Sequence, residues 1–292
     1  MKTDKVFYGD CMALAKTVPD DFVDLVVTSP PYADTLSYGD TIPTFHPDNY
    51  CDWFLPLFHE AARFLKPTGS FILNINDKII NKKRSTYVFE LIYRIEKETG
   101  LCLHDRYVWA KKNGSPTGSA PCRLDDRVEY IFHFVRKQKN KKGRYKNTPE
   151  SFKADIESLR EPYAESTIKR YSNSTVGFNK VVDENGIAEI PRKTAVVNEN
   201  GKIPTTVMRF NGAGTIRNSG AKHPAPFHPD LPRWFIEWLT DEGDVVLDPF
   251  LGGGTTAFVA KGMARKYLGF ELNENYKPLI EQRLNTLENI NG

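Results

Sequence analysis

The sequence predicts an α/β fold with an inserted region, and three observations support this prediction. Short apolar runs alternate with segments of helical periodicity at both ends of the 292-residue chain. The apolar run at 245–250 leads directly into the glycine-rich segment 251–256, as in a strand–turn–helix unit. Basic residues concentrate in the window 136–180, which carries a charge of +7 against +3 for the whole chain.

The composition is that of an ordinary globular protein, with 40% hydrophobic and 26% charged residues. It argues against wholesale disorder. No run of 18 or more apolar residues is present, so a membrane-spanning helix is not expected. The N-terminus also lacks the apolar core of an export signal. The four cysteines show no C-x-x-C spacing and the six histidines show no ligand spacing. We therefore expect a cytoplasmic protein with reduced thiols and no metal site.

Strands and helices are expected to alternate before the insert. The run at 22–27 stops at Pro30 and Pro31, because proline offers no amide hydrogen to a neighbouring strand. Apolar residues at helical spacing predict a helix over 48–65, with Asp48 as its N-cap. The predicted strands are 5–10, 22–27, 69–75, 106–110 and 128–135, and the predicted helices are 48–65 and 86–97.

The region 136–220 is expected to be a separate module, helical first and β-rich later. A Val-Val-x-Glu-Asn-Gly sequence at 181–186 recurs at 196–201, and its Asn-Gly pair favours a hairpin turn. The window 136–180 holds 12 basic and five acidic residues. This excess indicates either a surface for a polyanion or a solvated lysine-rich loop, and the run alone favours neither.

The segment after the insert predicts a nucleotide-binding type of βαβ unit. The predicted strands are 245–250 and 267–272, and the predicted helices are 233–239, 257–263 and 275–287. Glu271 follows Asp248 by 23 residues, a spacing that suits an acid on ribose hydroxyls. No lysine follows the glycines, which excludes a phosphate-cradling loop. The unit alone fits either NAD or S-adenosylmethionine, and Asp248 favours the latter because its carboxylate can meet an ammonium group. A purely structural glycine turn is the alternative.

The Thr-Ser-Pro-Pro-Tyr sequence at 28–32 has chemistry that suits methylation of a base amine. The amino group of a nucleobase is a poor nucleophile, because its lone pair is conjugated with the ring. The Ser29 hydroxyl and the Pro30 carbonyl can each accept one of its N–H bonds and favour a tetrahedral nitrogen. Tyr32 offers a flat face on which an extruded base can stack. An ordinary proline turn with a buried tyrosine is the alternative.

The combined motifs resemble the amino-group DNA methyltransferases of restriction–modification systems. Residues 27–32 resemble the signature of enzymes that methylate cytosine at N4, 248–256 resemble the family's cofactor motif, and 223–232 resemble the segment before it. The catalytic motif precedes the cofactor motif, which is the family's β arrangement. The resemblance implies a Rossmann-like, mostly parallel sheet of seven strands, with a reversed hairpin from 106–110 and 128–135. The catalytic domain would comprise 1–135 and 221–292, with 136–220 as the target-recognition region.

The resemblance also implies residue roles, a cofactor and partners. S-adenosylmethionine would be the methyl donor and double-stranded DNA would be the substrate. The enzyme would be a monomer or homodimer, and a restriction endonuclease acting on the same DNA site would be its companion. Ser29, Pro30, Pro31 and Tyr32 would form the catalytic pocket. The implied cofactor contacts are Asp10, Pro226, Phe227, Asp248, Phe250, Gly252, Gly254, Thr255, Thr256 and Glu271. The implied DNA contacts are Lys139, Lys141, Lys142, Arg144, Lys146, Lys169 and Arg170.

Three alternative activities remain at this stage. Methylation of cytosine at C5 needs a cysteine nucleophile, and Cys122 in a Pro-Cys pair is the candidate, although its loop follows the Ser-Pro-Pro-Tyr sequence. Methylation of adenine at N6 shares the pocket chemistry but usually has Asp or Asn in place of Ser29. A non-catalytic DNA-binding protein on the same scaffold is the third, and the intact Ser29, Asp248 and Glu271 argue against it. The sequence leaves the recognised DNA site open.

Overall fold

The computed structural model divides the chain into two compact units. One comprises 1–155 and 206–292 and the other comprises 156–205. The expected division into a catalytic domain of 1–135 and 221–292 and a target-recognition region of 136–220 concerns function and stays a prediction. The structure describes residues 1–33, 45–112, 124, 126–138, 152–172, 178–183, 186–191, 198–210 and 228–291.

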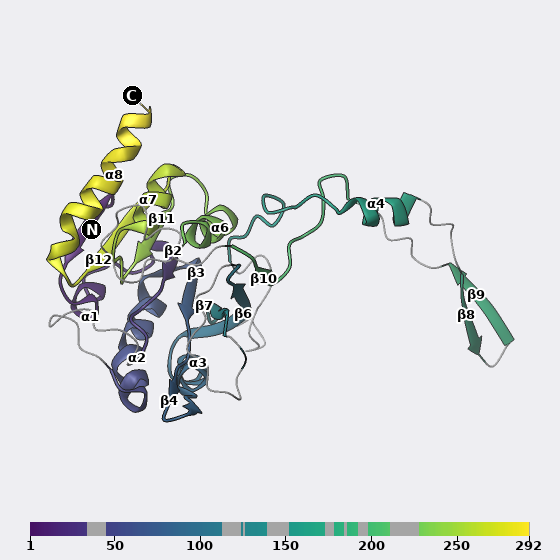
Figure 1. Cartoon of the computed structure of the whole chain (residues 1–292), viewed down its shortest axis with the longest axis horizontal. Coiled ribbons are helices and arrows are strands. Elements are labelled where there is room, and N and C mark those ends of the chain that lie inside the picture. Colours follow the sequence, from purple (N-terminus) through teal and green to yellow (C-terminus); the bar gives the residue numbers. More distant parts are fainter. Residues whose placement is uncertain are drawn as a thin grey trace. The chain divides into compact units, whose positions relative to one another are not determined.

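The larger unit is built on one mixed sheet, with strand order β1-β12-β11-β2-β3-β7-β6-β10 (Figure 1). The strands of this sheet are β1 Lys5–Tyr8, β2 Val23–Thr28, β3 Leu65–Ile75, β6 Leu101–Ala110, β7 Val128–Arg136, β10 Val207–Met208, β11 Val245–Asp248 and β12 Lys266–Glu271. Only β7 runs antiparallel to its neighbours, so the expected reversed hairpin with β6 is confirmed. The sheet has eight strands rather than seven, because the short β10 adds to the edge beside β6.

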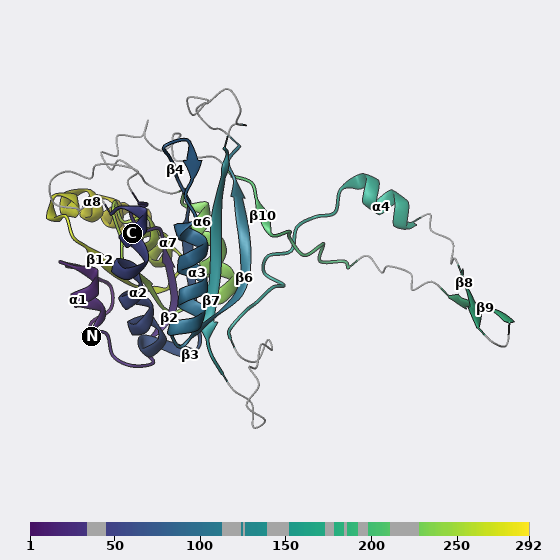
Figure 2. The same ribbon diagram turned by 90° about the horizontal axis from the view of Figure 1, so that it is seen from below.

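Helices form a layer on each face of this sheet (Figures 1 and 2). Phe58 of α2 packs against Phe71 and Phe134 on one face. On the other face, Trp238 of α6 packs against Tyr107 and His133. The first layer contains α1 Cys11–Ala15, α2 Pro47–Phe64 and α3 Tyr87–Glu98, and the second contains α6 Asp230–Leu239, α7 Thr255–Gly262 and α8 Lys277–Asn291. The 3-10 helix η2 Glu274–Tyr276 comes directly before α8. A small hairpin of β4 Ile79–Ile80 and β5 Lys83–Arg84 follows β3.

Helix α2 differs from its expectation at both ends. Its N-cap is His46, whose side chain accepts a hydrogen bond from the Asp48 backbone, so Asp48 lies in the first turn instead of capping it. At the other end, β3 begins at Leu65 without an intervening loop, four residues earlier than expected. Pro56 stays inside the helix on its exposed side. The helix therefore delivers the chain directly into the strand that borders the candidate site.

The smaller unit contains α4 Glu165–Ser172 and a hairpin of β8 Phe178–Asp183 and β9 Gly186–Pro191. The order of one helix before β-structure agrees with the expectation for this region. The pair Asp183–Gly186 closes the hairpin at the first of the two Asn-Gly repeats. At the second, Gly201 donates to Asn198 O at 3.0 Å in a turn, and Arg160 donates to the Gly201 carbonyl at 2.7 Å.

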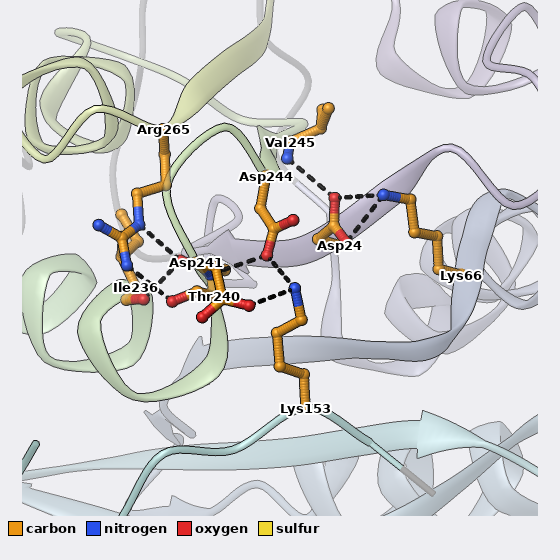
Figure 3. A network of polar contacts seen from close by, with 9 residues as sticks. All are labelled: Asp24, Lys66, Lys153, Ile236, Thr240, Asp241, Asp244, Val245 and Arg265. Carbon is orange, nitrogen blue, oxygen red and sulfur yellow. Dashed lines mark hydrogen bonds and ion pairs between the residues drawn. The ribbon is translucent and has the colours of Figure 1, made fainter.

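A polar network holds the amino-terminal edge of the main sheet (Figure 3). The buried Asp24 of β2 accepts from the Val245 backbone N–H at 2.9 Å and from Lys66 Nζ at 2.8 Å. Lys153 lies between Asp241 and Asp244 in the turn before β11, at 2.8 and 2.6 Å. Charged groups therefore connect β2, β3 and β11 at the amino-terminal ends of these parallel strands, opposite their carboxyl ends.

Asp24→Ala is expected to lower the free energy of unfolding by about 2–4 kcal/mol, because it leaves a buried backbone N–H unpaired and removes a partner of Lys66. Urea denaturation measures this change. Asp20→Ala is the matched control, since Asp20 also forms an ion pair, with Arg63, but its side chain is 72% exposed. The control is expected to lose less than about 1 kcal/mol, and equal losses would contradict the prediction.

Candidate active site

The candidate site lies at the edge where the parallel strands end. The strand ends of β2, β11 and β12 lie side by side there, in the register Leu247–Val26 and Asp248–Gly269. Because β7 is reversed, its first residues reach the same edge beside the end of β3. Open α/β sheets bind their ligands at this edge. Both sequence-predicted motifs are therefore brought together, from opposite ends of the chain.

The glycine-rich turn after β11 takes a left-handed backbone at two positions. Gly252 has φ +54° and Gly254, the N-cap of α7, has φ +82°. A Cβ on Gly254 would also lie 3.3 Å from Ile280 of α8, so both conformation and packing favour glycine there. Phe250, just before the turn, packs against Trp53 and Phe54 of α2. The turn is thus fixed by both helical layers.

Asp248 is buried at the end of β11 and binds groups from three segments. Its Oδ1 accepts from Thr28 Oγ1 at 2.7 Å and from the Phe250 N–H at 3.0 Å, and its Oδ2 accepts from Thr256 Oγ1 at 2.6 Å. Burial raises the pKa of Asp248 to about 6 despite these bonds. Within the described ranges no cation is paired with this carboxylate, so its charge is held by hydroxyl and amide dipoles alone.

Glu271 is buried at the end of the neighbouring strand. Its Oε2 accepts from the Gly252 N–H at 2.7 Å and its Oε1 accepts from the Asn273 N–H at 2.8 Å. Burial raises its pKa, and the Asp248 charge adds to the shift. Asp10 lies just after β1, the strand paired with β12, and caps α1 through the Met12 N–H. The expected cofactor acids therefore lie at, or just after, the ends of three adjacent strands.

The threonines that begin α7 face different partners. Thr256 binds Asp248, whereas Thr255 accepts from Arg283 Nη1 of α8 at 2.7 Å. Burial lowers the pKa of this arginine. Thr255 thus links the helix start to α8, and Thr256 links it to the β11 carboxylate.

The Ser-Pro-Pro-Tyr loop follows β2 directly. Pro30 is buried, and the Pro31 carbonyl accepts from Tyr50 Oη of α2 at 2.9 Å. Ser29 Oγ lies 3.2 Å from Tyr32 Oη, which donates to Glu129 Oε2 at 2.7 Å. Burial and the Glu129 charge raise the pKa of Tyr32 well above its ordinary value. The loop therefore presents a half-buried serine beside a phenol that remains protonated.

Sequence reasoning missed two buried polar residues of this site. Asn74 of β3 donates from Nδ2 to Tyr32 Oη at 2.9 Å and to Glu129 Oε2 at 2.8 Å. Glu129 of β7 also forms an ion pair with Lys111, which follows β6. The available signal was an amide or carboxylate next to the end of a mostly apolar run.

Within the described ranges, the structure adds no contact between this cluster and the remaining predicted residues. Lys169 and Arg170 are exposed on α4 of the smaller unit. Burial raises the pKa of Cys11 and Cys51 to about 12, which makes them poor nucleophiles. The predicted residues outside the described ranges are Pro226, Phe227, Lys139, Lys141, Lys142, Arg144 and Lys146, and the alternative nucleophile Cys122 is outside them too.

Neither a membrane-spanning helix nor a cluster of metal ligands lies in the described part of the chain. None of its helices combines the length and apolar character needed to cross a membrane. Nor do three or more His, Cys, Asp or Glu side chains gather there as metal ligands.

Comparison with protein families identifies the chain. The family described as DNA methylase (N6_N4_Mtase) matches residues 23–282, which span both motifs and the region between them. The chain belongs to this DNA methylase family. The type II methyltransferase M.PvuII of Proteus hauseri is 28% identical to it over 93% of this chain and 80% of its own length. The DNA adenine methyltransferase YhdJ of Escherichia coli strain K12 is 23% identical over 96% of this chain and 82% of its own.

Solved structures share the fold of this methylase. The cytosine-N4-specific PvuII DNA methyltransferase has a TM-score of 0.68 at 23% identity, over 99% of this chain and 92% of its own. The M1.HpyAVI–SAM complex has a TM-score of 0.58 at 18% identity, over 96% and 98%. The predicted methyltransferase fold is thereby confirmed, with the additional edge strand β10.

Asp248→Asn is expected to stabilise the ligand-free methylase at pH 8 by about 1–3 kcal/mol. The folded-state pKa of Asp248, about 6, exceeds the unfolded value, so the folded protein loses stability as pH rises through this range. An amide at this position can keep the bonds to Thr28 and Phe250 without a buried charge. Thermal melting against pH measures the gain, which is expected to shrink progressively below pH 6. A gain that is independent of pH would contradict the assignment.

Proposed function

We propose that this DNA methylase transfers a methyl group from S-adenosylmethionine to the N4 amine of cytosine in double-stranded DNA. The observation that carries the proposal is the hydrogen bond from Thr28 to Asp248. It joins the Ser-Pro-Pro-Tyr loop to the glycine-rich turn, so an amine held at Ser29 lies beside a donor held at the turn. The similarity to a cytosine-N4-specific structure supports the choice of target atom.

The residues at the turn fit a cationic cofactor. Asp248 and Glu271 are buried carboxylates, and the Asp248 charge adds to the cost of ionising Glu271; in the described ranges neither has a cationic partner. A positively charged ligand would compensate both. Asp248 would hold its ammonium group, Glu271 its ribose hydroxyls, and Gly252 and Gly254 would allow close backbone approach. Bound there, S-adenosylmethionine supplies an electrophilic methyl group on a sulfonium with a good leaving group.

The catalytic loop would orient the amine. Ser29 Oγ and the Pro30 carbonyl would accept its two N–H bonds and favour a lone pair directed at the methyl carbon. The Tyr32 hydroxyl is anchored to Glu129, which fixes the ring as a platform for an extruded base. The reaction needs no covalent bond between protein and base, so alignment and electrostatics account for catalysis.

Adenine N6 is the second candidate target, since a DNA adenine methyltransferase is among the relatives of this chain. Both targets are exocyclic amines with two N–H bonds, so Ser29 and Pro30 would hold either one. We favour cytosine because Ser29 stands where adenine enzymes usually have Asp or Asn. A non-catalytic DNA-binding role is less favoured, because the two buried carboxylates and the serine loop are intact.

The remaining proposals concern partners and setting. Residues 136–220 would recognise the DNA sequence, with basic side chains on the phosphates and others on base edges. The enzyme would act in the cytoplasm, as a monomer or homodimer, and protect DNA from a restriction endonuclease of the same specificity. The similarity to type II methyltransferases supports the role in restriction and modification.

Incubation with S-adenosylmethionine and methylation-free DNA is expected to yield N4-methylcytosine, detected by mass spectrometry of the nucleosides. Ser29→Ala is expected to lower the rate about 100-fold, because one acceptor for the amine is lost. Asp248→Ala is expected to abolish cofactor binding in calorimetry. Ser85→Ala is the matched control, because the Ser85 hydroxyl accepts a hydrogen bond from the Tyr87 N–H at the start of α3. N6-methyladenine as the product would overturn the cytosine assignment.

Replacing Lys169 and Arg170 of α4 by alanine together is expected to weaken DNA binding at all sequences alike. Each phosphate contact that is lost should reduce the slope of log K against log salt by about 1. Fluorescence anisotropy at several salt concentrations measures this slope. The control is the double variant Lys16→Ala/Lys97→Ala, which removes two exposed charges from the larger unit. Equal effects of the two variants would contradict a specific role for α4.

A further inference from the structure

Three side chains form a hydrogen-bond chain that leads away from Ser29. Ser29 Oγ lies 3.2 Å from Tyr32 Oη, and Tyr32 Oη lies 2.7 Å from Glu129 Oε2. Asn74 Nδ2 lies within 3.3 Å of all three oxygens. Glu129 is 9% exposed, so this chain ends on a buried carboxylate that the proposed methyl transfer does not use.

The direction of the chain follows from counting protons. A carboxylate has no proton to give, so Tyr32 must donate its single proton to Glu129. Tyr32 can then only accept from Ser29, which must donate its own single proton to Tyr32. The raised pKa of Tyr32 keeps that phenol protonated. Ser29 Oγ is left with lone pairs alone, and it can bind a further group only if that group donates an N–H or O–H.

Of the two carboxylate oxygens of Glu129, one takes part in the hydrogen-bond chain and the other binds Lys111. Lys111 Nζ, from the segment after β6, binds Oε1, whereas Tyr32 and Asn74 bind Oε2. Tyr32 and Lys111 are the titratable groups that contact this carboxylate from the described elements. Asn74 donates but has no basic atom, so the carboxylate is the group in this cluster that can take up a proton.

We propose that Glu129 is a positioning residue that orients Ser29 as an acceptor and receives the proton that the target amine loses. The inference rests on the proposed function. When the amine nitrogen forms its bond to the methyl carbon, the carbon–sulfur bond breaks and its electron pair stays on sulfur. The nitrogen then has one proton in excess, and its N–H electron pair returns to nitrogen as that proton leaves.

The proton moves by three short transfers. It passes to Ser29 Oγ as the serine proton passes to Tyr32 Oη and the tyrosine proton passes to Glu129 Oε2. Serine and tyrosine each gain one proton and lose one, and the carboxylate becomes a carboxylic acid. Lys111 takes no part in these transfers, so the net result is one proton moved from the amine to Glu129.

Single-turnover methylation at saturating DNA and S-adenosylmethionine tests this role, with wild type, Glu129→Gln, Tyr32→Phe and the double variant. Glutamine can accept the tyrosine bond but cannot become an acid, and phenylalanine interrupts the chain. Each single variant is expected to slow the step about 100-fold, with cofactor binding within about twofold. The double variant is expected to be no slower than the slower single one, because both interrupt one path.

The pH profile separates proton transfer from simple support of the loop. Glu129→Gln is expected to change the pH dependence of the rate, whereas a merely structural role of Glu129 would leave the shape of that dependence unaltered. Glu129→Asp, which keeps the carboxylate, should recover part of the rate. Glu98→Gln is the matched control, because Glu98 also pairs with a cation but is exposed on α3. Additive losses, or an unchanged pH dependence in Glu129→Gln, would overturn the inference. Absence of any methylated base with wild type would instead refute the proposed function.

Discussion

The hydrogen bond between Thr28 and Asp248 joins the two halves of the site, although 220 positions separate these residues in the chain. It can form because β2 and β11 are parallel neighbours and therefore end at the same edge of the sheet. Thr28 is followed at once by Ser29, and Asp248 is followed by the glycine-rich turn. The spacing between the catalytic loop and the turn is thus set by sheet pairing, which is far stiffer than either loop. The closing helix α8 supports the turn from the other side through Ile280.

The single reversed strand contributes what parallel strands cannot. A parallel strand brings only its last residues to the carboxyl edge, whereas β7 brings its first. Glu129 therefore comes early in β7 and meets Asn74 from near the end of β3 and Lys111 from just after β6. These groups share the face of the sheet that α6 covers, where Trp109 is directly opposite Glu129. The opposite edge is built differently, since its ion pairs between Lys153, Asp241 and Asp244 are partly exposed and serve the turn before β11.

Apolar periodicity and the positions of proline and glycine predicted most elements of the larger unit, because each strand or helix has its own local pattern. The motif residues were also predictable, since glycine turns and proline loops are contiguous in sequence. Asn74 and Glu129 were missed because each is an isolated polar residue next to the end of a mostly apolar run, and only strand pairing brings them to Tyr32. Strand β10 was also missed, because its two residues form a strand only through their pairing with β6. The cap of α2 was assigned to Asp48 by residue preference, but the backbone places His46 at that position.

The buried carboxylates of the site differ in how their charge is balanced, and this difference separates their roles. Asp248 and Glu271 are held by hydroxyls and backbone amides, and burial raises the pKa of both. Such an arrangement lowers the stability of the ligand-free protein and is relieved by a cation that arrives with a ligand. Glu129 already has Lys111 as its counter-ion, so it gains little from a cationic ligand. Among the described residues, its remaining oxygen contacts two proton donors, Tyr32 and Asn74. Asp248 and Glu271, which lack a counter-ion among the described residues, are therefore suited to binding a cationic ligand. Glu129, whose charge is balanced by Lys111, is suited to removing a proton.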